Sequence, residues 1–79
     1  MIDNPLGTAM KLDDGTLSVI VPGRWKDSLT DYLSTRRIEF NQPTRLNLPS
    51  PYLQYEIIVR GATEHDFREW SADLMLILK

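Results

Sequence analysis

The sequence predicts an α+β domain, a two-layer sandwich in which a four-stranded antiparallel sheet carries both helices on one face, in the order ββαββα. Two observations predict the strands: residues 8–21 and 38–60 alternate apolar and polar side chains with the period of two that is typical of a half-buried strand. A third predicts the helices, because apolar residues at helical spacing follow each of these stretches. Each predicted hairpin has an apolar face, and the helix after it can cover that face.

The first seven residues contain Asn-Pro and Gly and show no clear period. We therefore expect a flexible N-terminal arm over residues 1–7. A chain of 79 residues corresponds to one domain, which we place at residues 8–79.

Residues 8–21 are typical of a hairpin that turns at Asp14 and Gly15. This pair can adopt the positive φ angles of a two-residue type I′ turn. Such a turn pairs Met10 with Val19, and this register agrees with the alternation of apolar residues. The predicted inner face contains Met10, Leu12, Leu17, Val19 and Val21, and the predicted outer face contains Lys11, Ser18 and Ile20.

The apolar period becomes helical after Pro22 and Gly23, which predicts a helix over about residues 24–36. Its apolar residues follow the i, i+4, i+7, i+8 spacing of a helix that covers a core. They are Trp25, Leu29, Tyr32 and Leu33.

The second hairpin is predicted from residues 38–60. Pro43 interrupts its first half, and proline cannot donate to a β-ladder. We expect either an edge strand with a bulge or two short strands about residues 41–44, then a reversal at residues 49–51. The second strand should cover residues 53–60, with Leu53, Tyr55, Ile57 and Val59 inside.

The last helix is predicted over residues 64–78. Thr63 and Asp66 have the spacing of an N-cap residue and an acidic first turn. The inner stripe contains Phe67, Trp70, Ser71, Leu74 and Leu78, and the opposite side contains His65, Asp66, Glu69 and Asp73.

Two questions about this fold stay open in the sequence. A ferredoxin-like βαββα order is the alternative, and it applies if residues 8–13 are not a strand. The two halves also align weakly at an offset of 38 residues, with identities at Ile20/Ile58, Val21/Val59 and Gly23/Gly61. Either an internal duplication or two similar units of secondary structure explains this alignment.

The composition argues against several classes of partner and site. Nine basic and eleven acidic residues give a net charge of −2, too balanced to steer the chain toward nucleic acid or an anionic membrane. The absence of cysteine excludes disulfides and cysteine-ligated zinc. The chain opens without a signal-peptide pattern, and no apolar run approaches the roughly 18 residues of a membrane span. We therefore expect a cytoplasmic protein with no nucleic-acid or membrane partner.

The sequence predicts no catalytic, cofactor-binding or metal-binding residues. It contains no Gly-rich phosphate loop and no nucleophile elbow. His65 and Glu69, at i and i+4, could place two metal ligands together, with Asp66 and Asp73 on the same helix face. A solvated acidic face is the better explanation of these four residues, because no second cluster supplies further ligands. We do not expect an enzyme.

Two apolar features are not explained by the predicted core. Ile20 and Ile58 point outward at equivalent positions of the two halves, and Leu76 and Ile77 belong to a run of five apolar residues that one helix stripe cannot hold. Apolar patches on a small domain mark interaction sites. These four residues are the predicted protein interface.

The sequence therefore predicts a small non-enzymatic protein-interaction or regulatory module that self-associates as a homodimer or binds a partner protein. The alternative is a small-molecule-binding regulatory domain that holds its ligand at a dimer seam. Gly23 and Gly61 at strand-to-helix turns are compatible with that alternative, but they are also ordinary turn residues.

Overall fold

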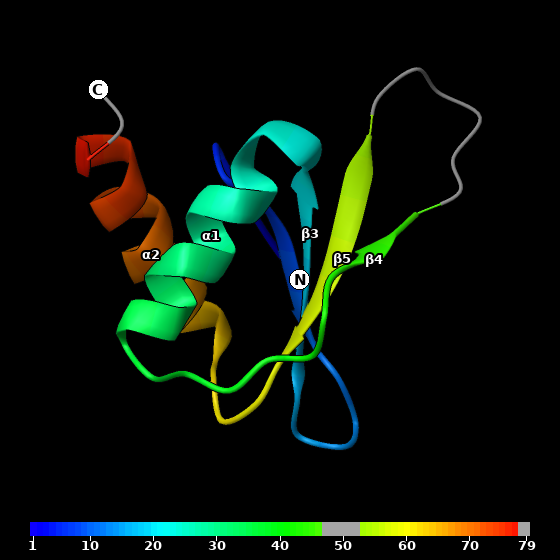
Figure 1. Cartoon of the computed structure of the whole chain (residues 1–79). Helices are drawn as coiled ribbons and strands as arrows, with labels where there is room; N and C mark the ends of the chain where they lie inside the picture. Colours follow the sequence, from blue (N-terminus) through cyan, green and yellow to red (C-terminus); the bar gives the residue numbers. More distant parts are fainter. Residues whose placement is uncertain (47–52, 78–79) are drawn as a thin grey trace.

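The computed structural model describes residues 1–46 and 53–77, with side chains up to Leu76. The elements in chain order are β1 (Ile2–Asn4), β2 (Gly7–Lys11), β3 (Leu17–Pro22), α1 (Gly23–Thr35), β4 (Thr44–Arg45), β5 (Gln54–Val59) and α2 (Glu64–Ile77). The sheet has the order β1-β2-β3-β5-β4, and all neighbouring strands are antiparallel. Both helices lie on one face of it (Figure 1). The predicted α+β class is confirmed, but the sheet has five strands where four were predicted.

The additional strand, β1, comes from the first seven residues, which the sequence predicted to be an arm outside the domain. The chain reverses between β1 and β2 at Pro5 and Leu6. Asn4 Oδ1 accepts a 2.9 Å hydrogen bond from the Leu6 N–H, which stabilises this turn locally. The Leu6 side chain is fully buried. A strand of three residues is too short to show a period, which is why the sequence pattern missed it.

The β2–β3 hairpin is confirmed, but its turn has three residues and not two. The Gly15 N–H donates a 3.1 Å hydrogen bond to Leu12 O. Gly15 itself has a φ of +88°, the left-handed conformation that ends a three-residue loop. Asp14 Oδ1 accepts hydrogen bonds from both the N–H and the hydroxyl of Thr16. Because this hairpin precedes α1, the ferredoxin-like alternative is excluded.

The longer turn shifts the predicted register of the hairpin by one residue and exchanges the two faces of β2. Met10, predicted inside, pairs with Ser18 and is 46% exposed on the outer face, and Ala9 is buried in its place. Lys11, predicted outside, lies on the helix side, where its Nζ donates a 2.7 Å hydrogen bond to Ala62 O. The register prediction for β2 was therefore wrong.

The edge beyond β5 consists of two short pieces, one of the two arrangements predicted for this stretch. Phe40 forms an isolated bridge to Val59, and β4 pairs with β5 after Pro43. Leu53, predicted inside, is 47% exposed and precedes β5. The reversal predicted at residues 49–51 lies outside the described residues.

The central strands β3 and β5 pair so that Val19 lies opposite Ile57. These two residues are separated by the same 38 positions at which the halves of the sequence align. A two-fold axis between them would therefore relate the two strands. This symmetry does not extend to the edge strand. Met10 pairs with Ser18, so an offset of 38 residues would give Glu56 a partner four positions after Thr44, but Glu56 pairs with Thr44 itself. Internal duplication stays a prediction.

Helix α1 covers β3 and β5 with the stripe that its spacing predicted (Figure 1). Leu29 and Leu33 are fully buried, and Trp25 and Tyr32 pack against the core at its margin. The helix ends at Thr35. The core between the layers consists of Leu6, Ala9, Leu17, Val19, Val21, Leu29, Leu33, Ile57, Val59, Ala62, Phe67, Trp70 and Leu74.

Helix α2 begins with the cap that the sequence predicted. Asp66 Oδ2 accepts a 2.8 Å hydrogen bond from the Thr63 N–H, and Thr63 Oγ1 accepts a 3.2 Å bond from the Asp66 N–H. This reciprocal pair satisfies donors at the helix start in the manner of a capping box. Phe67 and Trp70 are buried and meet edge to face. Neither helix, over its described length, is long and apolar enough to cross a membrane.

Candidate functional site

The face of the sheet opposite the helices is the first candidate site, and we call it the outer face. Cross-strand partners share a face, so the register assigns its residues. Alternate residues of the three middle strands are buried on the helix side. The outer face carries Asp3, Thr8, Met10, Ser18, Ile20, Pro22, Thr44, Gln54, Glu56 and Ile58. No described segment covers this face in Figure 1.

Three apolar side chains gather on the outer face, and we call Met10, Ile20 and Ile58 the outer apolar cluster. Ser18 lies opposite Met10 on one side and opposite Ile58 on the other, so these residues form one row across β2, β3 and β5. Ile20 is two positions along β3 from Ser18 and is therefore a diagonal neighbour of both apolar residues. Ser18 is only 5% exposed between these larger side chains.

The structure brings together two of the four predicted interface residues and separates them from the other two. Ile20 and Ile58, both partly exposed, lie on the neighbouring strands β3 and β5. Leu76 is 73% exposed on α2, in the opposite layer. Ile77 is the last residue of α2, and its side chain lies outside the described part. The four residues therefore do not form one surface.

Met10 is the outer-face residue that the sequence pattern missed. It was assigned to the core because a two-residue turn was assumed at Asp14 and Gly15. A three-residue turn with Gly in the left-handed position was the available signal, since Asp-Gly suits both. The correction adds an apolar residue to the outer face and removes Lys11 from it.

The charged groups at the described strand positions of the outer face are two carboxylates, Asp3 and Glu56. The Thr8 hydroxyl donates a 2.6 Å hydrogen bond to Asp3 Oδ1, and the Ser18 hydroxyl donates a 2.7 Å bond to Glu56 Oε2. Neither carboxylate forms an ion pair within residues 1–46 and 53–77. The strand positions of this face carry no Lys or Arg.

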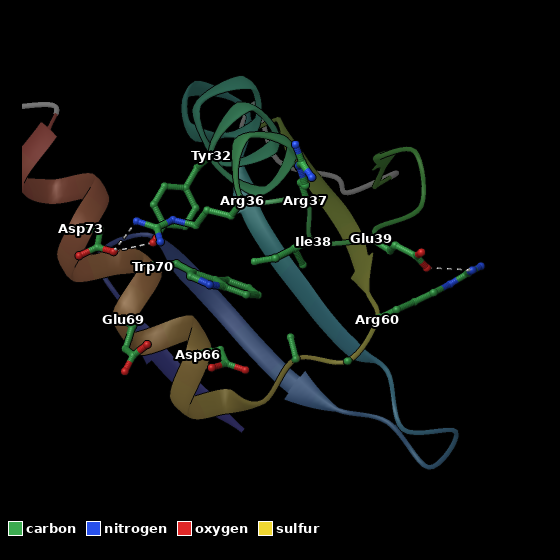
Figure 2. Close-up of a pocket in the computed structure, with 12 residues that line it drawn as sticks. Tyr32, Arg36, Arg37, Ile38, Glu39, Arg60, Asp66, Glu69, Trp70 and Asp73 are labelled. Carbon is green, nitrogen blue, oxygen red and sulfur yellow. Dashed lines mark hydrogen bonds and ion pairs between the residues drawn. The ribbon is translucent and has the colours of Figure 1, made fainter.

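A cleft on the helix side is the second candidate site (Figure 2). It has a volume of about 620 Å³ and lies between the end of α1, the segment after it, the β5–α2 turn and α2. Its volume is in the range of small-molecule pockets. The lining residues are Tyr32, Arg36, Arg37, Ile38, Glu39, Arg60, Gly61, Ala62, Asp66, Glu69, Trp70 and Asp73.

Most charged groups of the cleft are engaged with each other. Figure 2 shows Tyr32 and Arg36 reaching toward Asp73, whose Oδ2 accepts a 2.5 Å bond from the Tyr32 hydroxyl and a 3.3 Å bond from Arg36. Burial, and then this hydrogen bond, raise the pKa of Tyr32 to about 12. Arg60 contacts Glu39 at 4.0 Å. More of the charged side chains in the cleft are therefore paired with each other than are free to bind a ligand.

The acidic face of α2 is divided among several partners. His65 Nε2 contacts Glu69 Oε1 at 3.2 Å, and both side chains are largely exposed. Asp66 caps the helix, and Asp73 binds Tyr32 and Arg36. No three His, Cys, Asp or Glu residues in the part of the chain described here lie close enough together to hold a metal ion.

Resemblance to known proteins adds no evidence about either candidate site. The chain has no significant match among protein-family models, curated proteins or solved structures.

Proposed function

We propose that this chain is a small non-enzymatic protein-interaction module that binds a partner protein through the outer face of its sheet. The observation that carries the proposal is the outer apolar cluster, which lies on three adjacent strands with no described segment over it. An antiparallel sheet often leaves one face to water, but such a face is then mostly polar. Apolar residues at its centre favour contact with another protein.

The size of the outer apolar cluster suits an interface of moderate strength. Full burial of an exposed Ile or Met side chain contributes roughly 1.5–3 kcal/mol, and Ile20 and Ile58, unlike the exposed Met10, are already partly buried. A specific complex commonly covers about 800 Å² on each partner. The cluster would therefore serve as the centre of a larger contact whose rim includes the polar residues of the same face.

The cleft supports the small-molecule alternative less well. Its Arg36 and Asp73 are paired, and Trp70 on its wall is buried. A ligand would have to displace the Arg36–Asp73 ion pair or bind without using these two side chains. The cleft also lies within one chain, whereas the sequence led us to expect a ligand at a dimer seam.

Self-association is a second form of the proposal, and Leu76 favours it. This side chain is 73% exposed near the end of α2. An apolar residue this exposed could pack against a second copy, with the helix layers in contact. Light scattering over a range of concentrations tests this form, and a chain that stays monomeric in the micromolar range would remove it.

Two variants separate the proposed surfaces. Ile20→Thr/Ile58→Thr removes apolar area from the outer face and keeps β-branched side chains that suit strands. Leu76→Asp places a charge on the helix layer as the matched control. We expect a partner enriched from native cells by the wild-type chain to bind the Leu76→Asp variant equally and the double variant at least tenfold more weakly. Loss of binding in Leu76→Asp alone would contradict the assignment to the outer face.

A further inference from the structure

We infer that the partner presents Lys or Arg next to apolar side chains, so that its cations meet the carboxylates around the outer apolar cluster. This inference rests on the proposed function and names the chemistry of the partner. It follows from the charges of the outer face, which are of one sign within the strands: Asp3 and Glu56 are present, and no Lys or Arg is.

Glu56 lies inside the apolar cluster. It is opposite Ile20 on β3 and two positions from Ile58 on β5, so it is a neighbour of both. A partner that covers these isoleucines must also remove water from this carboxylate. Removing a carboxylate from water is costly unless a cation or hydrogen-bond donors replace the water. The Ser18 hydroxyl supplies one donor, and a carboxylate can accept about four hydrogen bonds.

A second copy packed through its own outer face does not supply that cation. Two outer faces packed together would contribute Asp3 and Glu56 twice, with no Lys or Arg from the strand positions of either. Like charges in a partly dehydrated contact repel each other. A different protein with a basic and apolar segment can cover the isoleucines and also supply a cation to the carboxylate.

The distance between the two carboxylates also predicts how far apart the cations of the partner segment lie. Asp3, Thr8, Ile20 and Glu56 form one row across β1, β2, β3 and β5. Three strand spacings separate the two acids, roughly 14 Å at about 4.8 Å each. A helix that lies across the strands covers this distance in about nine residues, and cations at that separation could reach both acids.

Two matched peptides test the charge of the partner. One is a short amphipathic helix of Leu and Lys, and the other replaces each Lys by Glu. Fluorescence anisotropy measures the binding of each to the full chain at low and at physiological ionic strength. We expect the Leu/Lys peptide to bind and the Leu/Glu peptide not to bind, with weaker Leu/Lys binding as salt increases.

Three variants of the chain locate the contact. Glu56→Gln keeps an acceptor for Ser18 and removes the charge, and we expect about fivefold weaker binding of the Leu/Lys peptide. Asp31→Asn removes one charge from the exposed side of α1 and should leave binding unchanged. Ile20→Thr/Ile58→Thr should weaken binding through the lost apolar contact.

The outcomes separate the two proposals. If both peptides bind and the isoleucine variant weakens both, the outer face binds protein but the inference of a basic partner is wrong. If the isoleucine variant binds both as the wild type does, the proposed function fails as well. An equal loss in Glu56→Gln and Asp31→Asn would show attraction to the net charge of the chain and would overturn the inference.

Discussion

The Ser18 hydroxyl donates a 2.7 Å hydrogen bond to Glu56 Oε2, across the two central strands and in the middle of the outer face. Ser18 and Glu56 are 38 residues apart in the chain, the offset at which the two halves align. The bond joins the halves and holds the carboxylate beside Ile20 and Ile58. The same pair therefore contributes to the stability of the sheet and to the electrostatics of the proposed interface.

Ser18→Ala removes this bond from a site that is 5% exposed. We expect the free energy of unfolding to decrease by about 1 kcal/mol, because the carboxylate loses a donor that the new methyl group cannot replace. Urea unfolding measures the change. Ser34→Ala, at an exposed helix position, is the control and should unfold at nearly the wild-type urea concentration. Equal stability of the two variants would contradict a contribution from the Ser18 bond.

The high pKa of Tyr32 predicts how stability depends on pH. The folded chain keeps Tyr32 protonated up to about pH 12, whereas an unperturbed tyrosine ionises at 10.0. The folded state therefore binds a proton that the unfolded state has lost, and this contribution to stability is present below pH 10 and disappears as the pH rises to about 12. Thermal unfolding in this range should show the decrease.

A direct titration isolates Tyr32 in a Tyr52→Phe/Tyr55→Phe background, followed by the absorbance of the phenolate. The midpoint should lie near 12, and Asp73→Asn should lower it, because the charged acceptor favours the protonated phenol. A midpoint at 10.0 that Asp73→Asn leaves unchanged would show that the hydroxyl is not held by Asp73 in solution.

Gly7 is predicted to tolerate no side chain. A Cβ at this position would come within 2.2 Å of Ile20 O, in the backbone of the neighbouring strand. Gly7→Ala should therefore destabilise the fold by roughly 3 kcal/mol or prevent folding. Gly15→Ala is the matched control, because its Cβ would meet no atom within 4 Å and only the left-handed backbone opposes it, at about 1 kcal/mol. Equal stability of the two alanine variants, measured by urea unfolding, would contradict the close approach of β2 and β3.

The capping box of α2 gives a smaller and separate effect. Thr63→Ala removes the acceptor for the Asp66 N–H and should lower the free energy of unfolding by about 1 kcal/mol. Thr30→Ala on the surface of α1 serves as the control, since Thr30 Oγ1 donates to a backbone carbonyl within the helix and caps nothing. Chemical denaturation that finds no difference between these variants would rule out the cap as a stabilising element.

The sequence predicted the elements with strong periods and missed those that depend on one or two residues. The stripe of α1, the pairing of Thr63 with Asp66 and the inner side of β5 from Ile57 to Val59 agree with the structure. The α2 stripe agrees up to Leu74, and the predicted Leu78 lies outside the described residues. In each case several residues carry the same periodic signal. Strand β1 has three residues and therefore carries no period.

The candidate site was harder to predict because it depends on one turn. Asp-Gly is compatible with loops of two and three residues, and the choice moves Met10 from the core to the outer face. The outward direction of Ile20 and Ile58 did not depend on that choice, since the alternation of β3 and β5 sets it. The predicted charge of the outer face did depend on the turn, because the same register shift moves Lys11 from the outer face to the helix side.

The measurement that tests the central claim most directly is the change in backbone amide NMR shifts when the Leu/Lys peptide is added to the full chain. We predict that the largest changes fall on Met10, Ser18, Ile20, Glu56 and Ile58, on the three strands that carry the outer apolar cluster. Changes concentrated instead around Leu76 on α2, or around Tyr32 and Arg37 at the cleft, would contradict the assignment of protein binding to the outer face.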